Sequence, residues 1–468
     1  MEPVTLSALT KAVGGTLLGS ALPETIVTRV CYDTRELSPG DLFLPLVGEH
    51  TDGHNFLDQA LENGAAGAFT ARKPSPLLPG KGYILVEDTA AVPAALAAWY
   101  RGQFDIPFVS VTGSVGKTTT KDMVAAVLSE KFSVHKTPAN HNNTLGVPMA
   151  LLDLKWEDQV SVIEMGMNHA GEIDAISALV RPQMALITNI GDAHIENLGS
   201  REGILAAKSE VFAHMAPDGV AILNGDDELL MTLKGKIKQP IVTCGASPYN
   251  DYYVTDLDRD LATDDLHCVL HTPKATVELT IPAVGDYMIY PVLMAAAVGE
   301  QLGMTGEEIA RGVLRYAPTK MRMNVIDRGA QVRILDDSYN ANPPSMRAGL
   351  QTLASTQRDF KIAILGDMLE LGPLGPGMHA MVGQLIAEDH IDCLVAIGEL
   401  ARHTAKAAED AQVPQVYWFG TKEEALPTIA KLVEPGSAIL VKASRRMAFE
   451  EIVQYLVSIT PEKEPPTP

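Results

Sequence analysis

The fold is decided by one stretch, Val109-Ser110-Val111-Thr112-Gly113-Ser114-Val115-Gly116-Lys117-Thr118-Thr119. An apolar strand runs into a glycine turn, and the turn opens an amphipathic helix that begins with Lys-Thr. The backbone N–H groups of such a turn, with a helix N-terminus behind them, form a concave site for nucleotide phosphates. In that arrangement Lys117 reaches the outer phosphates and the Thr118 hydroxyl is placed to hold Mg²⁺. Val111 stands where the common motif has its first glycine, so this is a variant phosphate-binding loop.

The composition predicts a globular protein of about three domains. The chain has 468 residues, 46% of them hydrophobic, and a formal net charge of −21. This acidity is spread along the chain and argues against nucleic acid as a partner, because nucleic-acid binding needs a basic face. No signal-peptide pattern and no run of roughly 20 apolar residues occurs, so we expect a cytoplasmic protein without membrane insertion. The four cysteines are far apart and are typical of reduced core residues.

Strand and helix patterns predict an α/β protein of three domains. Residues 1–102 alternate short strands, one of them over 27–32, with helices, and form a small N-terminal domain. Residues 103–316 form a central domain that carries the phosphate loop, and residues 317–468 form a C-terminal domain. The tail from Thr460 is rich in Pro, Glu and Lys, so we expect it to be disordered.

The two larger domains are predicted to contain parallel sheets. Apolar, β-branched runs, each followed by a helix-period segment, occur in the central domain at 108–111, 160–163, 184–188, 220–223 and 241–243. Runs that are apolar on both faces indicate a parallel sheet covered by helices, and the alternation at 276–281 indicates an antiparallel flank. A second set at 332–335, 361–365, 393–397, 416–419 and 438–441 predicts a Rossmann-like, doubly wound sheet.

Polar residues follow two predicted strands of the central domain, at the sheet edge where ligands bind. Glu164 and His194 are residue types that can hold Mg²⁺ between phosphate oxygens. Each alone is more often a capping acid or a loop histidine. Lys208, fourteen residues after His194, is by itself more often a solvated surface charge. The polar segments 142–148 and 336–344 are typical of turns, and because the second stands at a strand end and opens a helix, a ligand site is an equal alternative for it.

Taken in order, these motifs resemble the Mur ligases, from about residue 5 to residue 455. The resemblance rests on Tyr32-Asp33-Thr34-Arg35, Gly40-Asp41-Leu42-Phe43, Asp52-Gly53-His54, Thr112 to Thr118, Asn142-Asn143, Glu164 to Ile173, Ala193-His194, Lys208, Asp336 to Asn342, Gly366 to Gly372 and Val441 to Arg445. It implies an ATP-dependent amide ligase of peptidoglycan precursor synthesis, which serves cell wall biogenesis, cell shape and cell division.

Within the family, Gly366 to Gly372 is similar to the member that joins D-Ala-D-Ala to UDP-MurNAc-tripeptide through an acyl phosphate. The resemblance therefore implies these two substrates as partners, UDP-MurNAc-pentapeptide as product, and a monomer. Two alternatives stay open. One is the family member that adds the third peptide residue, and the other is a nucleotide-binding paralogue without ligase activity.

The resemblance also implies roles for individual residues. ATP is implied to contact Gly113, Ser114, Val115, Gly116, Lys117, Thr118, Thr119, Asn142, Asn143, Arg322 and Asp337. Two Mg²⁺ ions are implied, with Thr118, Glu164, His194 and Lys208 as ligands, the last as a CO₂-derived carbamate. Lys117, Glu164, His194 and Lys208 are the implied catalytic set. Thr34, Arg35, Asp52, Gly53 and His54 are implied to bind the UDP moiety, and Asn340, Asn342, Lys442 and Arg445 the acceptor dipeptide or the γ-phosphate.

One block departs from the family. After the antiparallel segment the family usually reads Gly-x-His-Asn-x-x-Asn, whereas this chain has Gly285-Asp286-Tyr287-Met288-Ile289-Tyr290-Pro291. Tyr, Met and Pro thus replace the polar groups expected near the adenosine end of ATP. Aromatic and thioether groups can still pack against a flat base, but no binding residue is assigned here.

Overall fold

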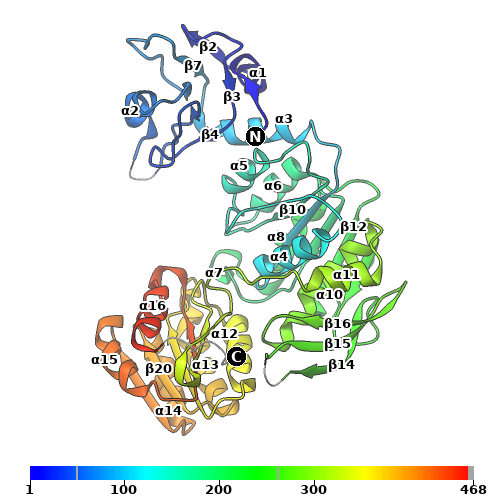
Figure 1. Ribbon diagram of the computed structural model, residues 1–468, viewed down its shortest axis with the longest axis vertical. Helices are drawn as coiled ribbons and strands as arrows, with labels where there is room; N and C mark the ends of the chain where they lie inside the picture. The colour runs from blue at the N-terminus through cyan, green and yellow to red at the C-terminus, as the bar shows by residue number, and fades with distance from the viewer. Residues whose placement is uncertain (49–50, 261–262, 462–468) are drawn as a thin grey trace, which may run out of the picture.

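The computed structural model describes residues 1–48, 51–260 and 263–461. Figure 1 shows the N-terminal domain at one end of the longest axis and the central domain in the middle. The C-terminal domain and a three-stranded sheet of the central domain lie at the other end. The tail that we expect to be disordered lies, from residue 462 onward, outside the described residues.

The N-terminal domain is a small α/β unit. Its five-stranded sheet has the order β2-β7-β6-β5-β4, and β1 pairs with β3. The strands are β1 (Val4–Thr5), β2 (Thr16–Gly19), β3 (Ile26–Val27), β4 (Val30–Cys31), β5 (Leu42–Phe43), β6 (Gly67–Thr70) and β7 (Gly82–Leu85), and the helices are α1 (Leu6–Ala12), α2 (Leu57–Glu62) and α3 (Val92–Arg101). The single strand predicted over 27–32 is wrong, because β3 and β4 belong to different sheets. The strand is interrupted at Arg29, whose guanidinium forms an ion pair with the buried Asp41 carboxylate.

The central domain is built on a six-stranded parallel sheet in the order β13-β12-β11-β8-β10-β9. The strands are β8 (Phe108–Thr112), β9 (Val134–Lys136), β10 (Val160–Glu164), β11 (Met184–Ile187), β12 (Val220–Asn224) and β13 (Ile241–Cys244). The helices are α4 (Lys117–Leu128), α5 (Gly146–Leu151), α6 (Glu172–Val180), α7 (Ile195–Leu198), α8 (Arg201–Ser209), α9 (Glu228–Met231), α10 (Ile289–Gln301) and α11 (Gly306–Val313). Five strands match the predicted runs, and β9 escaped prediction because it holds only one apolar residue.

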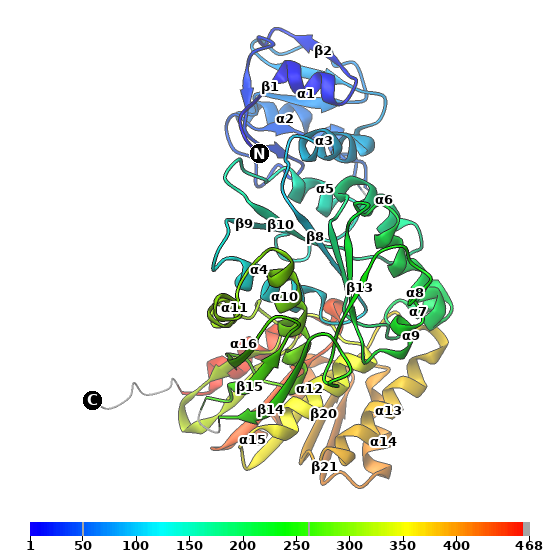
Figure 2. The same ribbon diagram turned by 90° about the vertical axis from the view of Figure 1, so that its right-hand side faces the viewer.

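Both faces of this sheet are covered, as the apolar runs predict. Phe108 packs toward α5 and α6, whereas its neighbour Val109 packs toward α4 and α10. The predicted antiparallel flank is confirmed as a sheet in the order β14-β15-β16, with β14 (Tyr253–Arg259), β15 (Leu266–His271) and β16 (Thr276–Ile281). It lies next to the C-terminal domain (Figure 2), and Arg259 Nη1 donates to Ser355 Oγ across the boundary at 2.8 Å.

The C-terminal domain contains the second doubly wound sheet, in the order β17-β18-β22-β19-β20-β21. Its strands are β17 (Asn324–Asp327), β18 (Arg333–Asp336), β19 (Phe360–Gly366), β20 (Cys393–Ile397), β21 (Gln415–Phe419) and β22 (Ser437–Lys442), and its helices α12 (Pro343–Ser355), α13 (Gly375–Glu388), α14 (Ala401–Asp410), α15 (Lys422–Leu432) and α16 (Glu450–Ile459). The unpredicted β17 is an antiparallel edge strand. The predicted α/β fold class, with its antiparallel flank and Rossmann-like third sheet, is confirmed.

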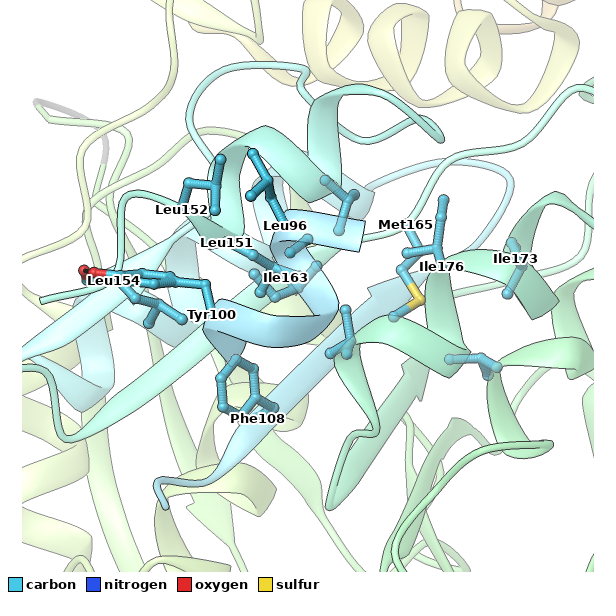
Figure 3. Close-up of a cluster of buried hydrophobic side chains, with 14 of the residues drawn as sticks. Leu96, Tyr100, Phe108, Leu151, Leu152, Leu154, Ile163, Met165, Ile173 and Ile176 are labelled. Carbon is cyan, nitrogen blue, oxygen red and sulfur yellow. Dashed lines mark hydrogen bonds between the residues drawn. The ribbon is translucent and has the colours of Figure 1, made fainter. Parts of the chain in front are cut away.

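The N-terminal and central domains share one hydrophobic core (Figure 3). Leu96 and Tyr100 of α3 pack with Leu151 of α5 and Ile176 of α6. The Tyr100 hydroxyl donates to Leu154 O at 2.8 Å, across the boundary between the domains. Helix α3 therefore anchors the first domain on the second.

The cysteines and the helices agree with the composition. Cys31, Cys244, Cys268 and Cys393 are buried free thiols, which confirms that they are reduced core residues. Over the described ranges, no helix combines the length and the apolar character needed to cross a bilayer.

Candidate functional site

The site forms at the carboxyl edge of the central sheet, where the phosphate loop follows β8. Gly113 and Gly116 have φ angles of 147° and 82°, a region that favours glycine. A Cβ on Gly113 would lie 1.9 Å from Thr188 Oγ1, so only glycine fits there. Asn189 Oδ1 accepts from the Val115 N–H at 3.0 Å and fixes the turn from the side. The predicted turn is therefore present, and α4 begins directly behind it.

Sheet order brings the other candidate residues to the same place. Strand β8 lies between β10 and β11, so the ends of these strands flank the phosphate loop. Glu164 ends β10 in register with Val111, and Ile187 of β11 is in register with Thr112. The segment that leads from β11 to His194 therefore starts beside the loop.

Lys117 lies over the glycine turn. Its Nζ donates to Gly113 O at 2.9 Å and, more weakly, to Ser114 O at 3.4 Å. Burial lowers the pKa of Lys117, and the neighbouring Glu164 carboxylate opposes that shift.

Glu164 is buried, with 1% of its surface exposed. Its Oε1 accepts from Asn142 Nδ2 at 2.7 Å, whereas the buried Oε2 has no hydrogen-bond partner. Lys121 Nζ lies 3.8 Å from that oxygen. A buried carboxylate oxygen without a donor is unusual and suits a cation ligand. Sequence analysis missed Lys121, although its spacing of four residues from Lys117 places both lysines on one face of α4.

Lys208 on α8 is 1% exposed, so the alternative of a solvated surface charge is wrong. Burial, and then the nearby Lys117, lower the pKa of Lys208 well below its ordinary value. Within the described ranges, its ammonium has no recorded ion pair or hydrogen bond. This buried amine close to the phosphate-loop lysine is therefore available for chemistry.

His194 connects the central domain to the C-terminal domain. It has a positive φ of 65°, and its Nδ1 lies 3.2 Å from Glu370 Oε2. That contact is close but lacks the alignment of a hydrogen bond, since Nδ1 is buried without such a partner. The imidazole therefore retains a free nitrogen near the domain boundary.

These side chains are too few to surround a cation by themselves, so a bound ligand would have to supply further donor atoms. In the part of the chain that the structure describes, no group of three or more His, Cys, Asp or Glu side chains is arranged to hold a metal ion. Thr118 and the free Oε2 of Glu164 are hard oxygen donors of the kind that Mg²⁺ selects. Mg²⁺ usually takes the rest of its shell from phosphates and water, so this sparse donor set is compatible with it.

A cleft of about 1390 Å³ lies between the central and C-terminal domains. Its lining includes Ser114, Val115, Gly116, Lys117, Thr118 and Thr119 from the phosphate loop, and Arg322, Asp337, Asn340, Asn342 and Lys442 from the C-terminal domain. The residues that line the cleft do not include Glu164, His194, Lys208 or Asn142. The structure thus brings most of the predicted ATP-site residues to one cleft.

The C-terminal wall of the cleft carries both basic and acidic side chains, and Lys442 connects two of its segments. Buried Lys442 Nζ donates to the Asp337 carboxylate and to Asn340 O, the latter at 2.9 Å. Burial lowers the pKa of Lys442, and Asp337 opposes that shift. Arg322 lies 3.9 Å above the ring of Tyr339, which aims its guanidinium along the wall.

Three predicted site residues have structural partners instead. Asn342 Oδ1 caps α12 by accepting from Ser345 N at 3.0 Å. Asn143 Oδ1 accepts from Gly146 N at 2.7 Å in the turn before α5. Arg445 pairs with Glu450 at 2.7 Å, and its side chain is 51% exposed outside the cleft. Of these three only Asn342 lines the cleft.

The predicted UDP-binding residues lie in the N-terminal domain, away from the cleft (Figure 1). Asp52 Oδ1 accepts from the His54 backbone N–H at 3.0 Å and faces His54 Nδ1 at 2.8 Å. A Cβ on Gly53 would lie 2.7 Å from Leu46 N, so the turn needs glycine. Thr34 is half-buried, and the exposed Arg35 pairs with Asp33 at 2.6 Å.

The block that departs from the family forms an apolar part of the cleft wall. Tyr287, Met288, Tyr290 and Pro291 all line it. The Tyr290 hydroxyl donates to Asp226 Oδ2 at 3.1 Å, and burial raises the pKa of Tyr290 to about 12. This wall offers flat, apolar surface to a ligand.

Comparison with known proteins matches this architecture domain by domain. Family models described as "Mur ligase family, catalytic domain", "Mur ligase middle domain" and "Mur ligase, glutamate ligase domain" match residues 26–100, 111–299 and 321–445. The chain is 36% identical to the UDP-N-acetylmuramoyl-tripeptide--D-alanyl-D-alanine ligase of Bacillus subtilis, over 97% of this chain and 98% of that protein. This chain belongs to the Mur ligase family.

Solved structures of Mur ligases share the whole fold. MurF from Acinetobacter baumannii superposes with a TM-score of 0.89 at 35% identity, covering 98% of this chain and 99% of that one. MurF ligase from Thermotoga maritima in complex with ADP has a TM-score of 0.80 at 26% identity, covering 92% and 97%. The second protein was solved with ADP, which accords with the nucleotide site expected of a Mur ligase with this cleft.

Proposed function

We propose that this Mur ligase joins D-alanyl-D-alanine to UDP-N-acetylmuramoyl-tripeptide with the hydrolysis of ATP to ADP and phosphate. The observation that carries the proposal is the match over nearly the full length to relatives with that printed name. The phosphate loop, which opens into an interdomain cleft lined by Lys117, Arg322 and Lys442, supports it independently. The product is UDP-MurNAc-pentapeptide, made in the cytoplasm by a monomer.

ATP would lie with its phosphates on the loop and its base toward the apolar wall of Tyr287 and Met288. The loop N–H groups and Lys117 would hold the phosphates. Thr118, Glu164, His194 and Lys208 would hold two Mg²⁺ ions, which supply charge neutralisation at the transferring phosphoryl group. The free Oε2 of Glu164 supports this assignment most directly.

Lys208 would serve as a carbamate. Its lowered pKa favours the neutral amine, which is the form that attacks CO₂. The amine nitrogen bonds to the carbon of CO₂ and releases one proton, so that a buried amine becomes an anion. Such an anion explains why a lysine lies beside proposed metal ligands.

The reaction would pass through an acyl phosphate. The free carboxylate of the tripeptide attacks the γ-phosphorus and ADP leaves. The amine of D-Ala-D-Ala then attacks the acyl carbon, and phosphate leaves from the tetrahedral intermediate. Lys117, Arg322 and Lys442 line the cleft and would stabilise the negative charge that is transferred. Closure of the two domains around the cleft would exclude water that could hydrolyse the acyl phosphate.

The substrates would enter from opposite sides. Thr34, Arg35, Asp52, Gly53 and His54 would hold the UDP moiety in the N-terminal domain. Asn340, Asn342, Lys442 and Arg445 would face the dipeptide, with Asn340 and Lys442 best supported because both line the cleft and contact each other.

The test measures phosphate release by purified protein with ATP, Mg²⁺, UDP-MurNAc-tripeptide and D-Ala-D-Ala. We expect release only when both peptide substrates are present, with formation of the pentapeptide. Use of a single diamino acid on the dipeptide precursor would indicate the ligase that adds the third residue. Binding of ADP without any substrate-dependent release would indicate a paralogue that has lost catalysis.

A further inference from the structure

Lys121 is a buried cation that the reaction scheme above does not use. It lies on α4 one turn after Lys117, and 1% of its surface is exposed. Burial lowers the pKa of Lys121, while Asp122 and Glu164 oppose that shift. A lysine is rarely buried to this degree unless its ammonium has a definite set of partners.

Its hydrogen bonds go to the backbone rather than to a carboxylate. Lys121 Nζ donates to Thr137 O at 2.9 Å and to Ala139 O at 3.2 Å. These carbonyls begin the segment between β9 and α5 that leads to Asn142. The ammonium therefore ties this segment to the phosphate-loop helix.

The same segment holds Glu164 in place. Thr137 Oγ1 accepts from the Glu164 N–H at 3.0 Å, and Asn142 Nδ2 donates to Glu164 Oε1 at 2.7 Å. Lys121 Nζ itself stops 3.8 Å short of Glu164 Oε2, which leaves that oxygen without a hydrogen bond. One cation thus anchors the segment that carries Asn142 and balances the carboxylate charge without occupying its free oxygen.

We propose that Lys121 is a positioning residue that holds Glu164 Oε2 in place, charged and free, for the divalent cation that accompanies the nucleotide. This inference rests on the proposed ATP and Mg²⁺ site. Because Lys121 is tied to two carbonyls, it stays in position when a cation approaches, and the carboxylate need not reorganise. Partners of this kind behind a metal ligand commonly affect metal affinity strongly.

The test compares ADP binding by calorimetry in excess Mg²⁺ and in EDTA. Lys121→Met keeps most of the length of the side chain but removes its charge. For this variant we expect near-normal ADP binding in EDTA, and a loss of about 10-fold or more in the amount by which Mg²⁺ strengthens ADP binding. Lys121→Arg should retain more of that enhancement than Lys121→Met. Lys131 offers a matched control, since it follows the other end of α4 and its Nζ pairs with Glu308 at 3.1 Å. Lys131→Met should therefore leave the enhancement within about twofold of wild type.

A double-mutant cycle shows whether Lys121 acts through Glu164. We expect Lys121→Met to add nothing to the loss caused by Glu164→Gln. If Lys121→Met fails to fold but the double variant folds, the unbalanced Glu164 is the cause and the proposal stands; if neither folds, the proposal is overturned. A folded Lys121→Met with the full Mg²⁺ enhancement would also overturn it. A wild-type protein that binds ADP equally well with and without Mg²⁺ would instead refute the proposed metal site, and the role of Lys121 with it.

Discussion

Lys208 should make the free energy of unfolding of this protein depend on pH, and replacing Lys208 by Met should remove that dependence. Its pKa in the folded state lies well below the ordinary 10.5 that it regains on unfolding. Between those two values the unfolded chain binds one more proton than the folded chain. The free energy of unfolding therefore rises with pH through that window, and the penalty from Lys208 disappears near pH 10.5.

The size of this effect follows from proton linkage alone. One extra proton bound by the unfolded state gives a slope of about 1.4 kcal/mol per pH unit at most. Lys208→Met keeps the buried volume and removes the amine, so its stability curve should lack that slope. Per pH unit inside that window, the difference in the free energy of unfolding between wild type and variant should change by up to about 1.4 kcal/mol.

The assay is urea unfolding followed by tryptophan fluorescence. The chain has three tryptophans, and in a Trp418→Phe background only Trp99 and Trp156 report, both near the junction of the first two domains. Buffers free of CO₂ keep Lys208 as an amine, and added bicarbonate should flatten the wild-type curve. Parallel curves for wild type and Lys208→Met across the range would refute the assignment of a buried neutral amine.

Three more outcomes are expected. Lys208→Ala should abolish ligation, because the carbamate is lost, and formate or acetate should partly restore turnover; near-normal turnover without additives would contradict the carbamate. Gly113→Ala should weaken ADP binding at least about 100-fold in calorimetry, because the new methyl would lie 1.9 Å from Thr188 Oγ1; ordinary affinity would mean that the turn is not required. Tyr100→Phe should lower the free energy of unfolding by about 1 kcal/mol or more, because the hydroxyl donates to Leu154 O and accepts from Glu2 N, and an unchanged midpoint in urea would show that these two bonds contribute nothing.

Parallel strands were predictable because burial on both faces leaves an unbroken apolar run. Five central strands and the five C-terminal runs match in this way. The missed strands lack that pattern, since β9 contains His135 and Lys136 and the edge strand β17 begins and ends with polar residues. Whether a short segment forms a strand depends on the neighbouring strand with which it pairs, and the local sequence pattern does not show this.

Site residues that a particular backbone conformation requires could be predicted from the sequence. Site residues that are distinguished only by the burial of their side chains could not. Gly113 and Gly116 adopt the turn expected of them, since positive φ angles need glycine. Lys208 and Lys121 look like ordinary helical lysines in the sequence, and only the packing around α8 and α4 reveals that both are buried. The roles of Asn342 and Arg445 remain predictions, and their observed partners are a helix cap and a surface ion pair.

The core shared by α3, α5 and α6 packs the first two domains against each other as one unit. If one end grips the nucleotide sugar of the substrate and the other holds the phosphate loop, the span between them is fixed before any ligand arrives. A precursor stem of the wrong length would then present its carboxylate short of the γ-phosphorus or beyond it. Any change in that span would have to open this core, whereas the cleft itself lies between the second and third domains.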